Sequence, residues 1–189
     1  MMGFMKLVLA FAPWLSFLII AHGSMFRLEL GLGIALGLSI LMGVLKLHRG
    51  VILWVGLAFF SAAFILVIGF QSMWTVRHMG VLANGALALG TWAGVVMRKP
   101  FTLDYAREQT DPAHWDSPIF LRTNMIITSA WGGVFTCNAL LAWLKMNKIV
   151  FSELTYEIFS YAALLGVAVF TQWYPAHLRR LRAKQAETA

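Results

Sequence analysis

The chain has 189 residues, of which 60% are hydrophobic and 12% are charged, and its mean hydropathy is +0.74. Soluble domains have roughly 45–50% apolar and about 25% charged residues, so this composition excludes an ordinary soluble globular protein. The net charge of +7 does not indicate nucleic-acid binding, because the positive residues stand at the ends of apolar segments. One cysteine, Cys137, excludes an internal disulfide and a cysteine-ligated zinc site.

Six apolar segments follow one another along the chain, each long enough for a membrane-spanning helix of about 20 residues when tilt is allowed for. They cover residues 7–22, 30–46, 51–70, 79–97, 123–144 and 157–174. The first, after Lys6, also has the basic start, apolar core and small-residue end of a signal peptide. We predict an all-α integral membrane protein, a six-transmembrane-helix bundle with one membrane domain, 1–176, and a basic cytoplasmic tail, 177–189.

The distribution of lysine and arginine predicts the orientation, because short cytoplasmic loops carry an excess of these residues. With a cytoplasmic N-terminus, eleven of the fifteen fall inside: Lys6, Lys46, Arg49, Arg98, Lys99, Arg107, Arg122, Arg179, Arg180, Arg182 and Lys184. The four on the outside are Arg27, Arg77, Lys145 and Lys148. We therefore expect both termini to be cytoplasmic.

Small and amide residues within the segments predict close helix contacts and hydrogen bonds between helices. The predicted helix-packing residues are Gly33, Gly37, Gly90, Gly94, Gly133 and Asn138. The same small residues also fit a seam between two copies of the chain, and this alternative stays open.

The longest connection, residues 98–122, is predicted to be cytoplasmic and to form two short helices at the membrane surface. Thr102 is expected to cap a first helix running through Gln109, and Asp111 followed by Pro112 is a second start signal. Phe101, Tyr105, Trp115, Ile119 and Phe120 supply apolar faces, and Arg107 with Glu108 supplies the solvated face, as an interfacial helix requires. The candidate partner-binding residues are Phe101, Tyr105, Arg107, Glu108 and Trp115.

An enzymatic reading of this connection has weak support. Asp104 and Glu108 share a helix face, but together with Asp111, His114 and Asp116 they match no established metal-site spacing. The motifs of zinc proteases, serine hydrolases, phosphate loops and dinucleotide-binding folds are missing from the sequence. We predict no catalytic residue and no metal site.

Histidines leave one cofactor alternative open. His22 and His78 fall on the predicted outer side, where the pair is a candidate for the axial ligands of a haem or for part of a quinone site. No histidine stands in the middle of a predicted helix, where a buried haem would need it. The leading prediction therefore includes no cofactor, with haem as the alternative.

A distributed set of residues resembles the bacterial intracellular septation protein A family. The residues are Phe11, Ala12, Pro13, Lys46, His48, Arg49, Lys99, Pro100, Trp115, Asn124, Trp131, Phe135, Asn138, His177, Leu178, Arg179 and Arg180. The resemblance implies an inner-membrane protein associated with division and envelope biogenesis, acting through protein contacts and without established catalytic residues.

We therefore expect a non-catalytic accessory subunit of the bacterial inner membrane that engages other membrane, division or envelope proteins through its cytoplasmic loop. Its other partner is the lipid bilayer, and no nucleic acid is expected. Two alternatives remain. One is a small transporter or channel subunit working as a homo-oligomer, and the other is a haem- or quinone-linked subunit of a redox complex.

Overall fold

The computed structural model describes residues 8–45, 50–108, 110–149 and 151–187, and within them all regular structure is helical. The elements are α2 (Ala12–Ile20), α3 (Met25–Val44), α4 (Val51–Phe64), the π-helical turn η1 (Ile65–Gly69), α5 (Met73–Val96), α6 (Thr102–Arg107), the 3-10 turn η2 (Pro112–His114), α7 (Pro118–Met146) and α8 (Glu153–Glu187). Five residues named in the sequence predictions lie outside the described part: Lys6, Lys46, His48, Arg49 and Gln109.

Five helical segments of the described chain are long and apolar enough to cross a membrane. They are Met25–Val44, Val51–Gly69, Met73–Val96, Pro118–Met146 and Glu153–Leu181. The segment predicted at 7–22 differs, because its described part consists of helical residues 8–10, a turn at Phe11 and the nine residues of α2. Pro13 explains the new start at this point, since proline fits the first turn of a helix and disrupts a helix interior.

Several helices begin earlier than their apolar segments predicted, because serine side chains cap them. The hydroxyl oxygens of Ser24, Ser72 and Ser117 accept backbone N–H groups three residues later, at 3.2, 3.3 and 3.2 Å. Such caps satisfy N–H groups that have no partner inside the helix. Hydropathy alone misses these starts, because Arg27, Arg77 and Arg122 interrupt the apolar sequence near the beginning of each helix.

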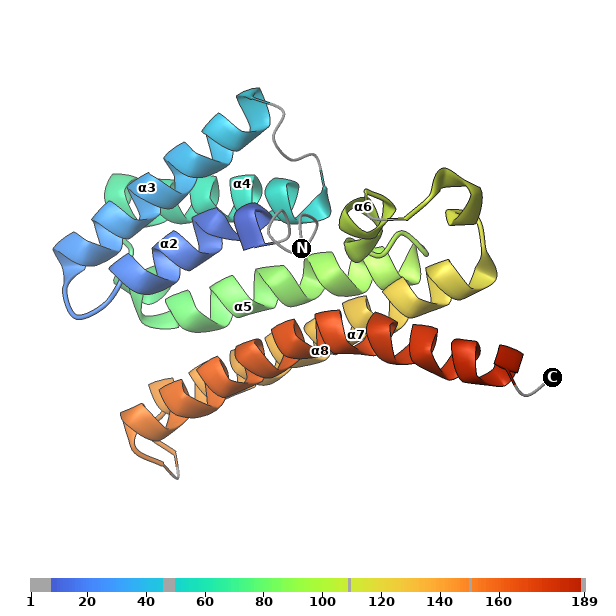
Figure 1. Ribbon diagram of the computed structural model, residues 1–189. Helices are drawn as coiled ribbons and strands as arrows, with labels where there is room; N and C mark the ends of the chain where they lie inside the picture. The colour runs from blue at the N-terminus through green and yellow to red at the C-terminus, as the bar shows by residue number, and fades with distance from the viewer. Residues whose placement is uncertain (1–7, 46–49, 109, 150, 188–189) are drawn as a thin grey trace.

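The last helix is longer than predicted at both ends. Residues 177–187, expected as a separate basic tail, continue α8, which contains Pro175 in its interior. Figure 1 shows this C-terminal part of α8 extending past the end of the bundle. The basic residues therefore project from the bundle on a helix.

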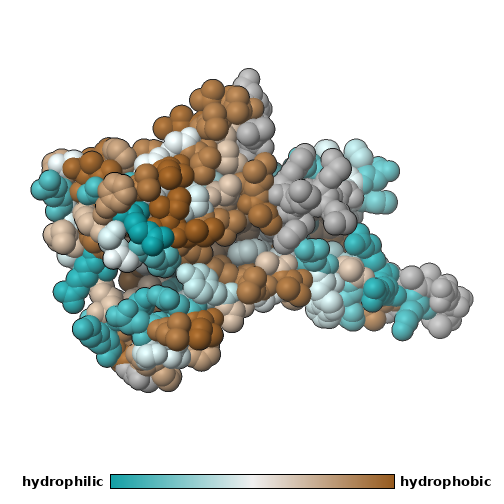
Figure 2. All heavy atoms as spheres, turned by 60° about the vertical axis from the view of Figure 1, so that its left-hand side comes forward, coloured by the Kyte–Doolittle hydropathy of each residue, from teal (hydrophilic) through white to brown (hydrophobic). Residues whose placement is uncertain are grey.

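The spans run antiparallel along the chain, and α5 packs most extensively against α7 (Figure 1). The turns after α2, η1 and α7 lie at one end of the bundle, while α6 and the C-terminal part of α8 lie at the other. Figure 2 shows hydrophobic side chains over the body of the bundle and hydrophilic side chains gathered toward its ends. This distribution is the one that a bilayer requires.

Two aromatic clusters hold the N-terminal segment to the bundle. In the first, Phe11 stacks on Trp131 of α7 with ring centroids 5.4 Å apart and meets Phe101 edge-on at 6.0 Å. In the second, Trp14 of α2 lies 4.8 Å from Phe60 of α4. Aromatic pairs in these geometries contribute about 0.5–1.5 kcal/mol beyond the area they bury.

Gly90 and Gly94 lie at close contacts. A Cβ at Gly90 of α5 would overlap Val55 of α4, so this glycine lets the two helices approach. A Cβ at Gly94 would lie 3.0 Å from the carbonyl oxygen of Lys99, where the chain folds back over the end of α5. The backbone N–H of Lys99 donates to the carbonyl of Gly94 at 2.8 Å, and Arg98 between them has φ +55°. Gly94 therefore leaves room for the chain to fold back over the C-terminus of α5, and it is not at a contact between two helices.

The other predicted packing glycines have more space. A Cβ at Gly33 would make an ordinary contact with Phe64 at 3.9 Å, and a Cβ at Gly37 or Gly133 would meet no atom of the described residues within 4 Å. Within the described part of the chain, these last two glycines are not at close helix contacts, which corrects their predicted role. The close contact in α7 is instead at Gly132, where a Cβ would lie 2.9 Å from the Trp92 ring.

Candidate functional site

The connection between α5 and α7 is tied to the bundle through α6. The Thr102 hydroxyl donates to the Asn124 carbonyl at 3.2 Å and shares a 2.9 Å hydrogen bond with the Thr128 hydroxyl, and all three residues are buried. The prediction that Thr102 caps this helix is wrong, because its side chain makes no capping bond. A buried hydroxyl requires a partner, and α7 provides two.

Phe101 and Tyr105 belong to the core of the protein. Their exposed fractions are 2% and 7%, and Phe101 meets the ring of Trp131 edge-on at 6.5 Å. The prediction that these two rings form a surface for a partner is therefore corrected: they anchor the connection to the bundle. Burial raises the pKa of the Tyr105 phenol well above its ordinary value, and the nearby Asp104 and Glu108 carboxylates raise it further.

Trp115 and Arg107 make contacts within the connection that hold its two halves together. The indole N–H of Trp115 donates to the carbonyl oxygens of Arg107 at 3.1 Å and Thr110 at 2.9 Å. The Arg107 guanidinium lies 5.6 Å from the centre of the Trp115 ring. Its Nε is buried and has no hydrogen-bond partner within the described part of the chain. The neighbouring Glu108 is exposed.

A cavity of about 510 Å³ lies between this connection and the start of α4. Its charged lining residues are Arg98, Lys99, Arg107, Asp104 and Asp116, and its other lining residues include Trp54, Trp115, Val51, Leu103 and Leu121. The connection therefore forms one wall of a hollow that carries both signs of charge.

The acidic residues of the connection are dispersed. In the described ranges, no three histidine, cysteine, aspartate or glutamate side chains are grouped closely enough to hold a metal ion. Asp111 has a structural role, because its carboxylate accepts the Ala113 N–H at 2.9 Å and starts η2, as its position before Pro112 predicted.

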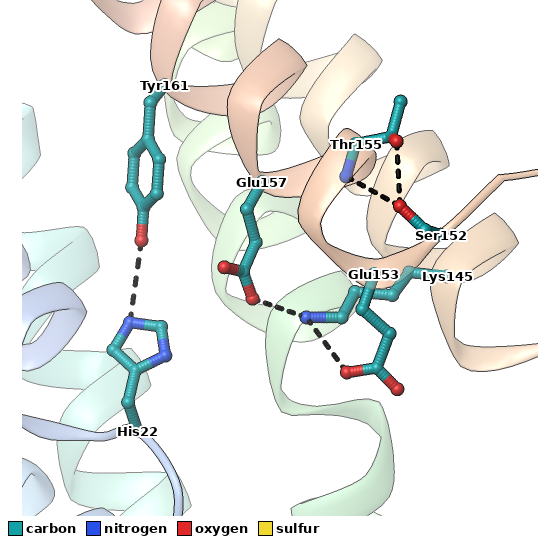
Figure 3. A network of polar contacts seen from close by, with 7 residues as sticks. All are labelled: His22, Lys145, Ser152, Glu153, Thr155, Glu157 and Tyr161. Carbon is teal, nitrogen blue, oxygen red and sulfur yellow. Dashed lines mark hydrogen bonds and ion pairs between the residues drawn. The ribbon is translucent and has the colours of Figure 1, made fainter.

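The opposite end of the bundle carries a second polar network, shown in Figure 3. Lys145 at the end of α7 contacts Glu157 of α8 at 2.7 Å and Glu153 at 3.9 Å. Beside them, the Tyr161 hydroxyl lies 3.5 Å from His22 Nε2. The sequence predictions missed this ion pair, although opposite charges on both sides of a short interhelical loop were the available signal.

The two histidines of the haem alternative have separate surroundings. His22 contacts Tyr161, whereas the His78 ring stacks on Trp74 with centroids 4.2 Å apart and its Nδ1 lies 2.8 Å from the Trp74 carbonyl oxygen. The interactions found among the described residues include none that joins the two histidines.

Polar side chains within the spans make two kinds of hydrogen bond, between helices or within one helix. Asn138 is 2% exposed, and its amide lies 3.4 Å from the Ser160 carbonyl oxygen of α8. Thr136 accepts a hydrogen bond from the Trp92 indole of α5 at 3.1 Å. Asn84 donates to Gly80 of its own helix instead. The hydrogen bonds of Asn138 and Thr136 therefore connect α7 with α8 and with α5.

Compared with known proteins, the chain matches no family model, no curated protein and no solved structure. Its class follows from the fold: this is an all-helical, multi-pass membrane protein. The start of α4 was not predicted as part of the site, because its lining residues Gly50, Val51 and Trp54 lie more than forty residues before the others and no local pattern marks them.

Proposed function

We propose that the protein is a six-span component of the bacterial inner membrane with both termini in the cytoplasm, and that it works as a non-catalytic interaction subunit in division or envelope processes. Its contact surface is the exposed side of the 98–122 connection. Arg107, Glu108 and Trp115 remain candidates for contact, whereas Phe101 and Tyr105 hold the connection in place.

The charge distribution supports this orientation. Arg98, Lys99, Arg107 and Arg122 belong to the connection that joins α5 to α7, and the basic end of α8 lies at the same end of the bundle. The opposite end carries Arg27, Arg77, Lys145 and Lys148, so the excess of basic residues at the first end favours a cytoplasmic location for it.

One observation carries the proposal: the connection is a folded element fixed to the bundle. Its buried side is held by the Thr102 bonds and the Phe101 contacts, while Asp111, Ala113 and His114 are exposed. A fixed surface loses less conformational freedom on binding than a flexible loop does. This surface is therefore suited to a partner of defined shape.

The test is photo-crosslinking in living bacteria. A photoreactive phenylalanine analogue replaces Ala113, and the matched control carries it at Lys148, an exposed position at the opposite end. We expect Ala113 to give one discrete adduct with another membrane, division or envelope protein and Lys148 to give none. Absence of an adduct at Ala113, or the same adduct at both positions, contradicts the proposal.

A second candidate is a transporter or channel subunit that works as a homo-oligomer. It is favoured by Gly37 and Gly133, where a Cβ would have no atom of the described residues within 4 Å, so that a second copy can approach closely. Mass determination of the intact protein in mild detergent tests it, and a strict monomer contradicts it.

A further inference from the structure

The cavity beside the 98–122 connection has the size and position of a lipid headgroup site. Its volume of about 510 Å³ falls within the range of roughly 300–1,000 Å³ that ligand pockets occupy. Its walls are the first turn of α4, which begins a membrane span, and the connection that precedes α7, which begins another. The cavity therefore lies where the spans end, at the level of the lipid headgroups.

One set of lining residues suits a phosphate. Arg98, Lys99 and Arg107 all line the cavity, and within the described part of the chain none of them forms an ion pair. The guanidinium of Arg107 is oriented by Trp115, and its buried Nε–H lacks an acceptor there. An arginine held in one orientation is well suited to bind phosphate oxygens.

The start of α4 adds to this positive side. Gly50, the N-cap of the helix, also lines the cavity and has no side chain to accept the first backbone N–H groups. Helix N-termini with free N–H groups attract anions. Here this effect supplements the three cationic side chains.

The other charged lining residues suit an ammonium group. Asp104 and Asp116 are exposed, and neither forms an ion pair with a cation of the described chain. A purely anionic ligand would be repelled by two carboxylates in the same cavity. A ligand that carries a phosphate and a primary ammonium together complements both sets.

The rim of the cavity is apolar on the side of the spans. Val51 and Leu121 line it, and Trp54, which is 66% exposed, stands at the first turn of α4. Tryptophan is enriched at this depth of the membrane because its ring is amphipathic. Acyl chains leaving the cavity along these side chains would enter the bilayer directly.

We propose that this cavity binds the headgroup of one phosphatidylethanolamine molecule. The phosphate lies against Arg98, Lys99 and Arg107, and the ammonium donates to Asp104 and Asp116. The inference goes beyond the proposed function. Lipid binding is measured on the purified protein, so its outcome does not depend on any protein partner.

Native mass spectrometry of the full-length protein tests it. Micelles contain equal amounts of phosphatidylethanolamine, phosphatidylcholine and phosphatidylglycerol with identical acyl chains. We expect one bound phosphatidylethanolamine per chain, at about ten times the affinity for phosphatidylcholine, whose methylated ammonium has no N–H to donate. Equal binding of the three lipids overturns the proposal, as does a preference for phosphatidylglycerol.

Two double variants test the phosphate-binding residues and the ammonium-binding residues of the cavity separately. R98Q/K99Q changes exposed side chains and should weaken phosphatidylethanolamine and phosphatidylcholine binding by a similar factor of about ten, because both lipids carry the phosphate. D104N/D116N should weaken phosphatidylethanolamine binding more than phosphatidylcholine binding and so reduce the preference between these two lipids, because both headgroups are cationic but only the first donates N–H groups to the carboxylates. K148Q, an exposed cation at the opposite end, is the control and should change neither. If both double variants bind lipid as the wild type does, the site lies elsewhere.

A competition experiment separates the lipid from a soluble ligand with the same polar groups. Phosphoethanolamine, which lacks acyl chains, should not displace the lipid at equal concentration. Equal binding of phosphoethanolamine would overturn the assignment to a lipid. Circular dichroism of each variant before measurement ensures that a loss of binding reflects the site and not unfolding.

Discussion

Two neighbouring glycines of α7 differ in what surrounds them. A Cβ at Gly132 would lie 2.9 Å from the Trp92 ring, whereas one at Gly133 would meet nothing within 4 Å. The Trp92 indole also donates to Thr136, so a shift of the ring costs a hydrogen bond between α5 and α7. The two positions therefore form a matched pair in one helix.

We predict that Gly132→Ala lowers the free energy of unfolding by about 1–2 kcal/mol, because overpacking exceeds the gain in helix propensity. Gly133→Ala is the control and should be neutral or stabilising by up to about 1 kcal/mol. Unfolding by sodium dodecyl sulfate in mixed micelles, followed by circular dichroism, measures both. Equal effects of the two substitutions would contradict the contact at Gly132.

Tyr105 gives a prediction for alkaline pH. Its pKa is raised in the folded protein, mainly by burial, whereas in the unfolded chain it ionises near the ordinary tyrosine pKa of 10.0. The unfolded state therefore loses this proton first, so the contribution of Tyr105 to stability is complete below pH 10 and declines as the pH rises above it. The decline reaches about 1.4 kcal/mol per pH unit.

The measurement compares wild type with Tyr105→Phe between pH 9 and 11. The difference in unfolding free energy between the two proteins should change with this slope above pH 10, and the phenolate absorbance of the two folded proteins should stay equal. A wild-type phenol that titrates near pH 10 in the folded protein would show that Tyr105 is accessible to water.

At the scale of elements, α6 is too short to be stable alone, since isolated helices below about 12 residues are marginal in water. Its stability comes from burial of Phe101 and Tyr105 and from the Thr102 bonds to α7. The aromatic residues of the connection predicted an amphipathic element correctly, but not that its apolar side faces the bundle.

We predict that Thr102→Val and Thr128→Val each lower the free energy of unfolding by about 1–2 kcal/mol. Thr102→Val leaves the buried Thr128 hydroxyl without its partner, and Thr128→Val removes one of the two partners of the buried Thr102 hydroxyl. The double variant should cost less than the two added together, with a coupling energy of about 1 kcal/mol. Thr123→Val is the control, since that hydroxyl bonds to Ile119 of its own helix. Strict additivity would mean that the two threonines do not interact.

At the scale of the whole molecule, the antiparallel order of the spans places the 98–122 connection and the α7–α8 loop at opposite ends of the bundle. Asp111 and Lys148 are exposed at these two ends. Cysteine at either position, in a Cys137→Ser background, reports the side of the membrane on which it lies.

We predict that a membrane-impermeant maleimide labels Lys148→Cys in bacteria with a permeabilised outer membrane and labels Asp111→Cys only in inverted inner-membrane vesicles. The excess of basic residues near Asp111 is the physical reason. The reverse pattern would contradict the orientation, and labelling of both positions from one side would contradict the number of spans between them.

The sequence by itself determined the class of this protein and the approximate positions of its long helices, because an apolar run of about 20 residues has few alternatives to a helix in a bilayer. It also indicated the start of η2, since an aspartate before a proline acts locally. These features depend on neighbouring residues only.

Only the tertiary structure decided which face of each helix packs against the rest of the protein. Only the fold brings Phe11, Phe101 and Trp131 together, opens a cavity between Trp54 and Arg107, and places Gly132 rather than Gly133 against a neighbouring helix. In a membrane helix both lipid and protein favour apolar side chains, so hydropathy does not distinguish the buried face from the exposed one. For that reason the aromatic residues of the connection were predicted to contact a partner, while the structure places two of them in the core.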